Sequence, residues 1–99
     1  MRLTPQQAAI IRDTAREVLG ADARVWLFGS RVDDSKRGGD IDLLIECDRP
    51  ITNPAFSAAR MAARVQRGLH GRKVDVLLAA PDLLRLPIHD IARSQGVSL

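Results

Sequence analysis

The chain has 99 residues, of which 45% are apolar and 27% charged, and this predicts one small globular domain over residues 1–99 with a modest core. The formal net charge of +3 suits phosphate-bearing partners, but an aromatic content of 3% argues against direct nucleic-acid binding. No apolar run is long enough to span a membrane, and no secretory signal is apparent, so we expect no membrane contact. The lone cysteine, Cys47, excludes an internal disulfide, and we therefore expect a cytoplasmic protein.

A first helix is predicted over about residues 4–19. Thr4 is a suitable N-cap, Pro5 fits the first helical position, and Gln7 completes a capping-box pattern. Gly20 is a natural end for the helix. The expected apolar stripe consists of Ile11, Ala15, Val18 and Leu19.

Three short apolar runs predict buried strands, at residues 25–28, 41–46 and 73–78. The polar segment 31–39 is expected to be a loop, and residues 48–53 a connection. Residues 81–86 fit either a short helix or a turn.

Two further helices are predicted. The second runs from about residue 53 to 69, and its buried side is expected to hold Phe56, Ala59, Ala63 and Val65. The last begins near Pro87, covers Ile88, Ile91 and Ala92, and closes at Gly96. Because helices and strands alternate, we expect an α/β fold in which helices cover a sheet.

Two carboxylates stand out at the start of the second strand. Residues two apart on a strand point to the same face, so Asp40 and Asp42 project side by side while Ile41 and Leu43 face a core. Neighbouring carboxylates repel each other, and a hard divalent cation relieves that repulsion.

Asp75 lies inside the third apolar strand, where an ionised group is costly unless it is paired or bound to metal. If this strand lies beside the second, Asp75 joins Asp40 and Asp42 in a three-carboxylate cluster. Such a cluster suits two metal ions that promote in-line phosphoryl or nucleotidyl displacement. Taken alone, Asp75 fits equally well as a salt-bridge partner of Arg72 or Lys73.

A phosphate-binding turn is predicted after the first strand. Gly29 permits a sharp turn, and backbone N–H groups together with the Ser30 hydroxyl form a cradle for phosphate oxygens. Gly39, which follows Gly38, allows close approach of the chain to a triphosphate, and Arg31 adds positive charge. A turn without function is the alternative interpretation of Gly29 and Ser30.

These residues resemble a known family. Gly29-Ser30, then Asp40-Ile41-Asp42 in an apolar strand, then the later Asp75, follow the pattern of the DNA polymerase β-like nucleotidyltransferases. The short chain and its ending through Gly96 are similar to the minimal nucleotidyltransferase (MNT) branch. The resemblance implies a small mixed sheet with packed helices.

The resemblance also implies a function. Asp40, Asp42 and Asp75 are expected to be catalytic ligands of two Mg²⁺ ions, and Gly29, Ser30, Arg31 and Gly39 to bind the nucleotide. The donor is expected to be ATP, whose AMP moves to an acceptor hydroxyl. MNT proteins commonly act with a helical partner, a HEPN-type toxin or a substrate-binding subunit, so we expect a homo- or hetero-oligomer. An antitoxin-like module that binds a partner without catalysis is the alternative.

Other polar groups have simpler interpretations. Arg60, Arg64 and Arg67, at helical spacing, predict a solvated face or a contact with a partner or with the acceptor substrate. His70 and His89 belong to no His/Cys cluster, so a zinc site is not expected.

Overall fold

The structure is a computed structural model that describes residues 3–28 and 41–99. The predicted loop and five of the expected site residues, Gly29, Ser30, Arg31, Gly39 and Asp40, lie outside the described residues. The described elements, in chain order, are α1 (Pro5–Leu19), β1 (Arg24–Phe28), β2 (Ile41–Glu46), α2 (Pro54–Gly68), β3 (Val74–Ala79), α3 (Pro87–Gln95) and β4 (Val97–Ser98).

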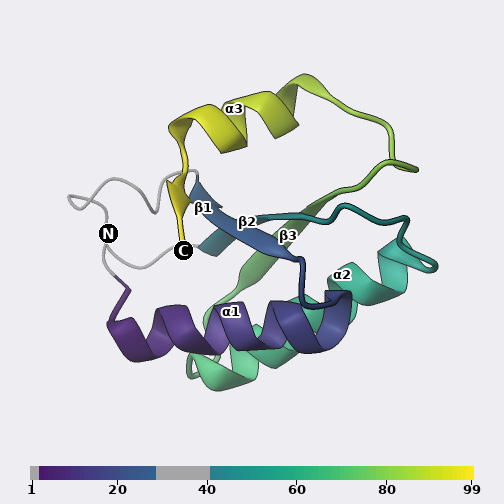
Figure 1. The fold of residues 1–99 in the computed structure, drawn as a ribbon. Helices are drawn as coiled ribbons and strands as arrows, with labels where there is room; N and C mark the ends of the chain where they lie inside the picture. The colour runs from purple at the N-terminus through teal and green to yellow at the C-terminus, as the bar shows by residue number, and fades with distance from the viewer. Residues whose placement is uncertain (1–2, 29–40) are drawn as a thin grey trace.

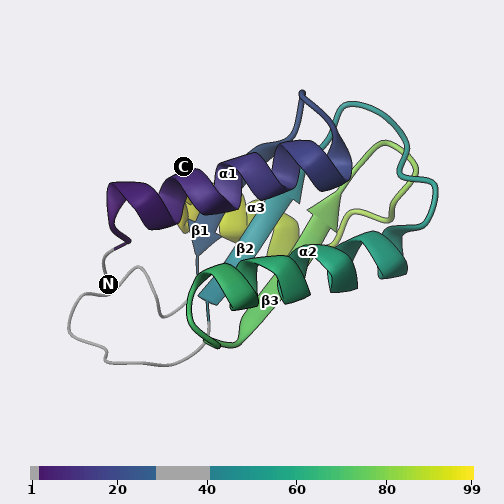
Figure 2. The same cartoon turned by 90° about the horizontal axis from the view of Figure 1, so that it is seen from below.

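The strands form a mixed sheet in the order β3-β2-β1-β4. β1 pairs antiparallel with β2 and with β4, whereas β2 and β3 are parallel. Helices α1 and α2 cover one face of this sheet, and α3 crosses the other (Figures 1 and 2). The predicted α/β fold with a small mixed sheet is therefore confirmed.

The first helix begins and ends as its sequence predicts. The Thr4 hydroxyl accepts a hydrogen bond from the backbone N–H of Gln7 at 3.0 Å, and the Gln7 side chain accepts one from the backbone N–H of Thr4 at 2.9 Å. Gly20 follows the last turn with φ of 110°, a left-handed conformation that favours glycine. These local contacts set where α1 begins and ends.

The main core lies between the sheet and the pair α1 and α2. Ile41, Leu43 and Ile45 alternate along β2, and all are fully buried on this face. Ile11 of α1 and Met61 of α2 meet them with no exposed surface. β2 is thus held at the centre of the domain. Its polar side chains lie on the opposite face of the sheet from this core.

The predicted buried side of α2 is wrong. Phe56 is 62% exposed, and Ala59 and Ala63 are also exposed. The buried stripe instead consists of Met61 and Val65, which are one helical turn apart and carry larger apolar side chains than the alanines. Val65 was placed correctly.

Two smaller features complete the comparison. Residues 81–86 form a turn and irregular chain, not a short helix, and the two-residue strand β4 was not predicted. In the described parts of the chain, none of the helices has the length and apolar character needed to cross a membrane.

Candidate functional site

The strand register aligns one aromatic and two acidic residues across the sheet. Phe28 of β1 is paired with Asp42 of β2, and Asp42 is paired with Asp75 of β3. Paired residues of neighbouring strands share a face, and the strands lie about 4.8 Å apart. We name Phe28, Asp42 and Asp75 the carboxylate row. It lies at the end of the sheet where β1 ends and β2 and β3 begin.

The carboxylate row belongs to the face of the sheet opposite the main core. Asp42 alternates with the buried Ile41 and Leu43, and its side chain is half-buried. Asp75 alternates with Val74 in the same way and is exposed. The predicted meeting of these two carboxylates is therefore observed. Asp40 is outside the described residues.

The salt bridge offered as the alternative for Asp75 is not found among the described residues. Within residues 3–28 and 41–99, no cation forms an ion pair with its carboxylate, so the salt bridge to Arg72 or Lys73 is absent. No group of three His, Cys, Asp or Glu side chains that could hold a metal is found within those same ranges. Of the three carboxylates in the predicted cluster, the structure thus brings together Asp42 and Asp75, and Asp40 lies outside the described residues.

A second row, Trp26, Leu44 and Leu77, lies next to the carboxylate row on the same face. α3 covers this row: Leu44 is only 1% exposed, and Ala92 of the helix is fully buried. Arg93 lies over the Trp26 ring at 5.7 Å from its centroid, a cation–π contact. Because α3 covers the second row, the carboxylate row is the more open part of this face of the sheet.

His89, which sequence reasoning left without a role, fixes the start of α3. Its side chain is buried, with 6% exposure. Nδ1 accepts a hydrogen bond from the backbone N–H of Leu86 at 2.9 Å, and Nε2 lies 2.9 Å from the carbonyl oxygen of Leu78. A neutral ring with its proton on Nε2 satisfies both contacts. No sequence signal identified this bridge, because Leu78 is eleven residues away.

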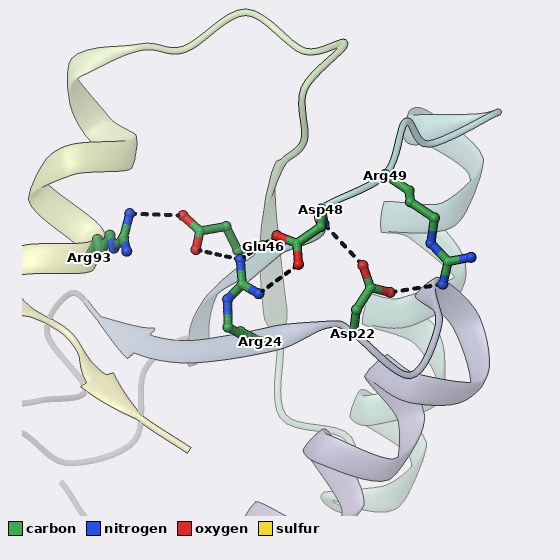
Figure 3. A network of polar contacts seen from close by, with 6 residues as sticks. All are labelled: Asp22, Arg24, Glu46, Asp48, Arg49 and Arg93. Carbon is green, nitrogen blue, oxygen red and sulfur yellow. Dashed lines mark hydrogen bonds and ion pairs between the residues drawn. The ribbon is translucent and has the colours of Figure 1, made fainter.

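The third row contains Arg24 and Glu46 and begins an ionic network at the far end of the sheet (Figure 3). Arg24 contacts Glu46 at 3.2 Å and Asp48 at 2.9 Å, and Arg93 contacts Glu46 at 3.4 Å. Asp22 joins it by accepting from the backbone N–H of Asp48 at 3.1 Å and from the Arg49 side chain at 3.2 Å.

The network shifts the ionisation of its members. Hydrogen bonds from Arg24 lower the pKa of Asp48. In turn, the hydrogen bonds to Asp48 and then to Glu46 raise the pKa of Arg24. The hydrogen bond from the Asp48 backbone, followed by that from Arg49, lowers the pKa of Asp22. A pocket of about 350 Å³ lies beside this network. Arg93 joins the network through Glu46, so the network links α3 to the sheet.

The remaining polar candidates lie away from the carboxylate row. Arg60 and Arg67 are exposed on α2, across the sheet from it, and Arg64 pairs with Glu17 of α1. Cys47 is buried, and burial raises the pKa of its thiol. His70 is exposed. The described residues therefore point to one acidic site, at the start of β2 and β3.

The mixed sheet, the helices on both faces and the carboxylate row define an α/β domain of the nucleotidyltransferase type. The nucleotidyltransferase domain family matches residues 9–95, and this chain belongs to that family, which includes the minimal nucleotidyltransferases. A comparison with curated proteins finds no match. The protein is therefore an enzyme of nucleotidyl-group transfer, a class that generally uses a nucleoside triphosphate and a divalent metal.

Proposed function

We propose that this protein is a Mg²⁺-dependent nucleotidyltransferase that moves AMP from ATP to an acceptor hydroxyl and releases pyrophosphate. The observation that carries the proposal is the register of β2 and β3, which pairs Asp42 with Asp75 on one face of the sheet. Both side chains lie on strands of a tightly packed layer, so their spacing is fixed before substrate binds.

The two carboxylates fit a magnesium site. Mg²⁺ is bound in proteins by carboxylate oxygens together with substrate phosphates, and Asp42 and Asp75 offer such oxygens on adjacent strands. Asp40, two residues before Asp42, would supply the third carboxylate. The metal, when bound, supplies positive charge that neutralises the reacting phosphates and lowers the pKa of the acceptor hydroxyl.

The nucleotide contacts are assigned from the sequence. Gly29 and Ser30 follow the last residue of β1, Phe28, which belongs to the carboxylate row. We assign the β- and γ-phosphates to Gly29 and Ser30, and further nucleotide contacts to Arg31 and Gly39. Asp42 and Asp75, with Asp40, would hold the metal that contacts the triphosphate and the acceptor hydroxyl.

We also propose that residues 1–99 form a single domain and that it acts with a helical partner protein, a HEPN-type toxin or a substrate-binding subunit. The described layers surround one main core and offer no second lobe to enclose an acceptor. A separate polypeptide would supply that lobe. Co-expression with the neighbouring gene product, followed by size-exclusion chromatography with light scattering, tests this part.

The test of the catalytic proposal compares three carboxylate substitutions. Asp42→Asn and Asp75→Asn keep the side-chain shape but remove a charge needed for metal, so we expect nucleotidyl transfer to fall by several orders of magnitude. Asp13→Asn, on the exposed side of α1, is the matched control and should keep wild-type activity.

The assay combines calorimetry of ATP binding, with and without Mg²⁺, and transfer of label from α-³²P-ATP to the co-purified partner. We expect nucleotide binding that requires Mg²⁺ and is lost in both site variants. Wild-type transfer rates in Asp42→Asn and Asp75→Asn, or no Mg²⁺-dependent binding at millimolar ATP, would refute the proposal.

A further inference from the structure

The pocket beside the ionic network lies at the other end of the sheet from the carboxylate row. Its walls are the start of β1, the residues that end β2 and β3, the chain over residues 80–85, and α3. Glu46, in its wall, follows Asp42 by four residues along β2, so the pocket and the carboxylate row lie about 13 Å apart. The pocket is therefore separate from the site proposed for nucleotidyl transfer.

One wall of the pocket is apolar. Ala80 and Leu83 are half-buried and pack against the main core, and the backbone N–H of Leu83 donates to the carbonyl oxygen of Ala80 at 3.1 Å. Leu84, at the same wall, is 78% exposed. The core thus holds this wall in place, and Leu84 presents apolar surface that a ligand could bury.

The opposite wall carries three guanidinium groups and two carboxylates, part of which Figure 3 shows. Arg24 is paired with both carboxylates, Glu46 and Asp48, and Arg85 with an aspartate of α3. Arg93 has a single ion pair, at 3.4 Å to Glu46, and donates no hydrogen bond to any residue that the structure describes. Its side chain is 52% exposed. Of the three guanidinium groups, that of Arg93 thus has the most donors left for a ligand.

The size of the pocket limits the ligand. Its volume is about 350 Å³. A water molecule takes about 30 Å³ in the liquid, so the space holds a molecule of roughly ten heavy atoms. A nucleoside triphosphate is several times larger than this. The occupant is therefore a small molecule other than the donor substrate.

The charges of the wall limit the ligand further. Three guanidinium groups repel a cation, whereas Glu46 and Asp48 repel any second negative charge on an anion. A group with one negative charge and two acceptor oxygens matches the planar donors of an arginine, and a carboxylate has both. We propose that this pocket binds a small monocarboxylate with an apolar body. The carboxylate accepts hydrogen bonds from Arg93, and the apolar body lies against Leu83 and Leu84.

The experiment is a titration of ¹⁵N-labelled protein with phenylacetate, followed by NMR. Phenylacetate should shift the amide signals of Ala80, Leu83 and Leu84 with a Kd of about 1 mM, a scale typical of such small ligands. 2-Phenylethanol, which lacks the carboxylate, and acetate, which lacks the apolar body, should each bind roughly tenfold more weakly.

Two variants test the two walls separately. Arg93→Gln should weaken phenylacetate binding roughly tenfold, and Arg60→Gln, on the exposed side of α2, is its matched control. Leu84→Ser removes apolar surface without touching the ionic network, so it tests the site even where Arg93→Gln loosens α3. It should also weaken binding, and Phe56→Ser, which removes a 62% exposed side chain of α2, should not.

The site's separation from the carboxylate row has its own test. Asp42→Asn should bind phenylacetate as the wild type does, and ATP with Mg²⁺ should leave the phenylacetate shifts in place. Displacement by ATP would overturn the proposal, because the pocket would then belong to the nucleotide. Equal affinity for phenylacetate and 2-phenylethanol, unchanged affinity in Leu84→Ser, or shifts confined to other parts of the chain would each overturn it as well.

Discussion

Replacement of His89 by alanine tests the attachment of α3 to the sheet. The substitution removes two hydrogen-bond partners, one for the buried carbonyl oxygen of Leu78 and one for the partly buried N–H of Leu86. An unsatisfied buried group costs about 1–3 kcal/mol, and a group that water reaches costs about 1 kcal/mol. We therefore expect His89→Ala to lower the free energy of unfolding by about 3 kcal/mol.

Urea denaturation and thermal melting followed by circular dichroism measure this loss. For a domain of this size, 3 kcal/mol corresponds to a decrease in Tm of roughly 12–24 °C. His70→Asn is the control, since His70 is exposed with φ of 60°, a conformation that asparagine tolerates. A loss below about 1 kcal/mol in His89→Ala, equal to that of the control, would show that the ring does not hold α3.

Two further predictions concern stability. In Gly96→Ala the new Cβ would lie 2.9 Å from one backbone carbonyl oxygen and closer still to another, so we expect a loss of about 1–3 kcal/mol in urea denaturation. In Gly68→Ala the new Cβ would meet a side chain and not the backbone, the Cγ2 of Ile10 at 2.9 Å, so this variant should lose less than Gly96→Ala, and equal losses in the two variants would contradict this reasoning. The second prediction concerns acid. Because the folded-state pKa values of Asp22 and Asp48 lie below the ordinary aspartate value of 3.8, the folded protein binds fewer protons than the unfolded chain in that range. Their stabilisation is therefore present above 3.8 and lost as the pH falls below it through the lower folded-state pKa values. Melts at pH 7, 5 and 3 should show a smaller decrease for Asp48→Asn than for wild type.

Local signals were sufficient for most of the fold. The cap at Thr4, the glycine after Leu19 and the apolar runs on either side of the loop each depend on neighbours in sequence, so they could be placed from the chain alone. The pairing of Asp42 with Asp75 was expected only on the condition that β2 and β3 are neighbours. The strand register shows that β2 and β3 are neighbours.

The errors and omissions have a common physical origin. α2 carries alanines on more than one side, and only packing against Ile11 and the sheet selects the Met61 and Val65 side over Ala59 and Ala63. The contacts of His89 and the network around Arg24 join residues far apart in the chain. β4 has two residues, too few for a periodic pattern.

The helices on the two faces of the sheet differ in how many buried apolar contacts hold them. Among the described residues, the main core cluster takes members from α1, α2 and the first three strands but none from α3. α3 depends on a few contacts, chiefly those of His89, Ala92 and Arg93. Segments with few buried apolar contacts open at a lower free energy than the whole domain. α3 can thus open or change in sequence while the main core, and with it the pairing of Asp42 and Asp75, stays in place.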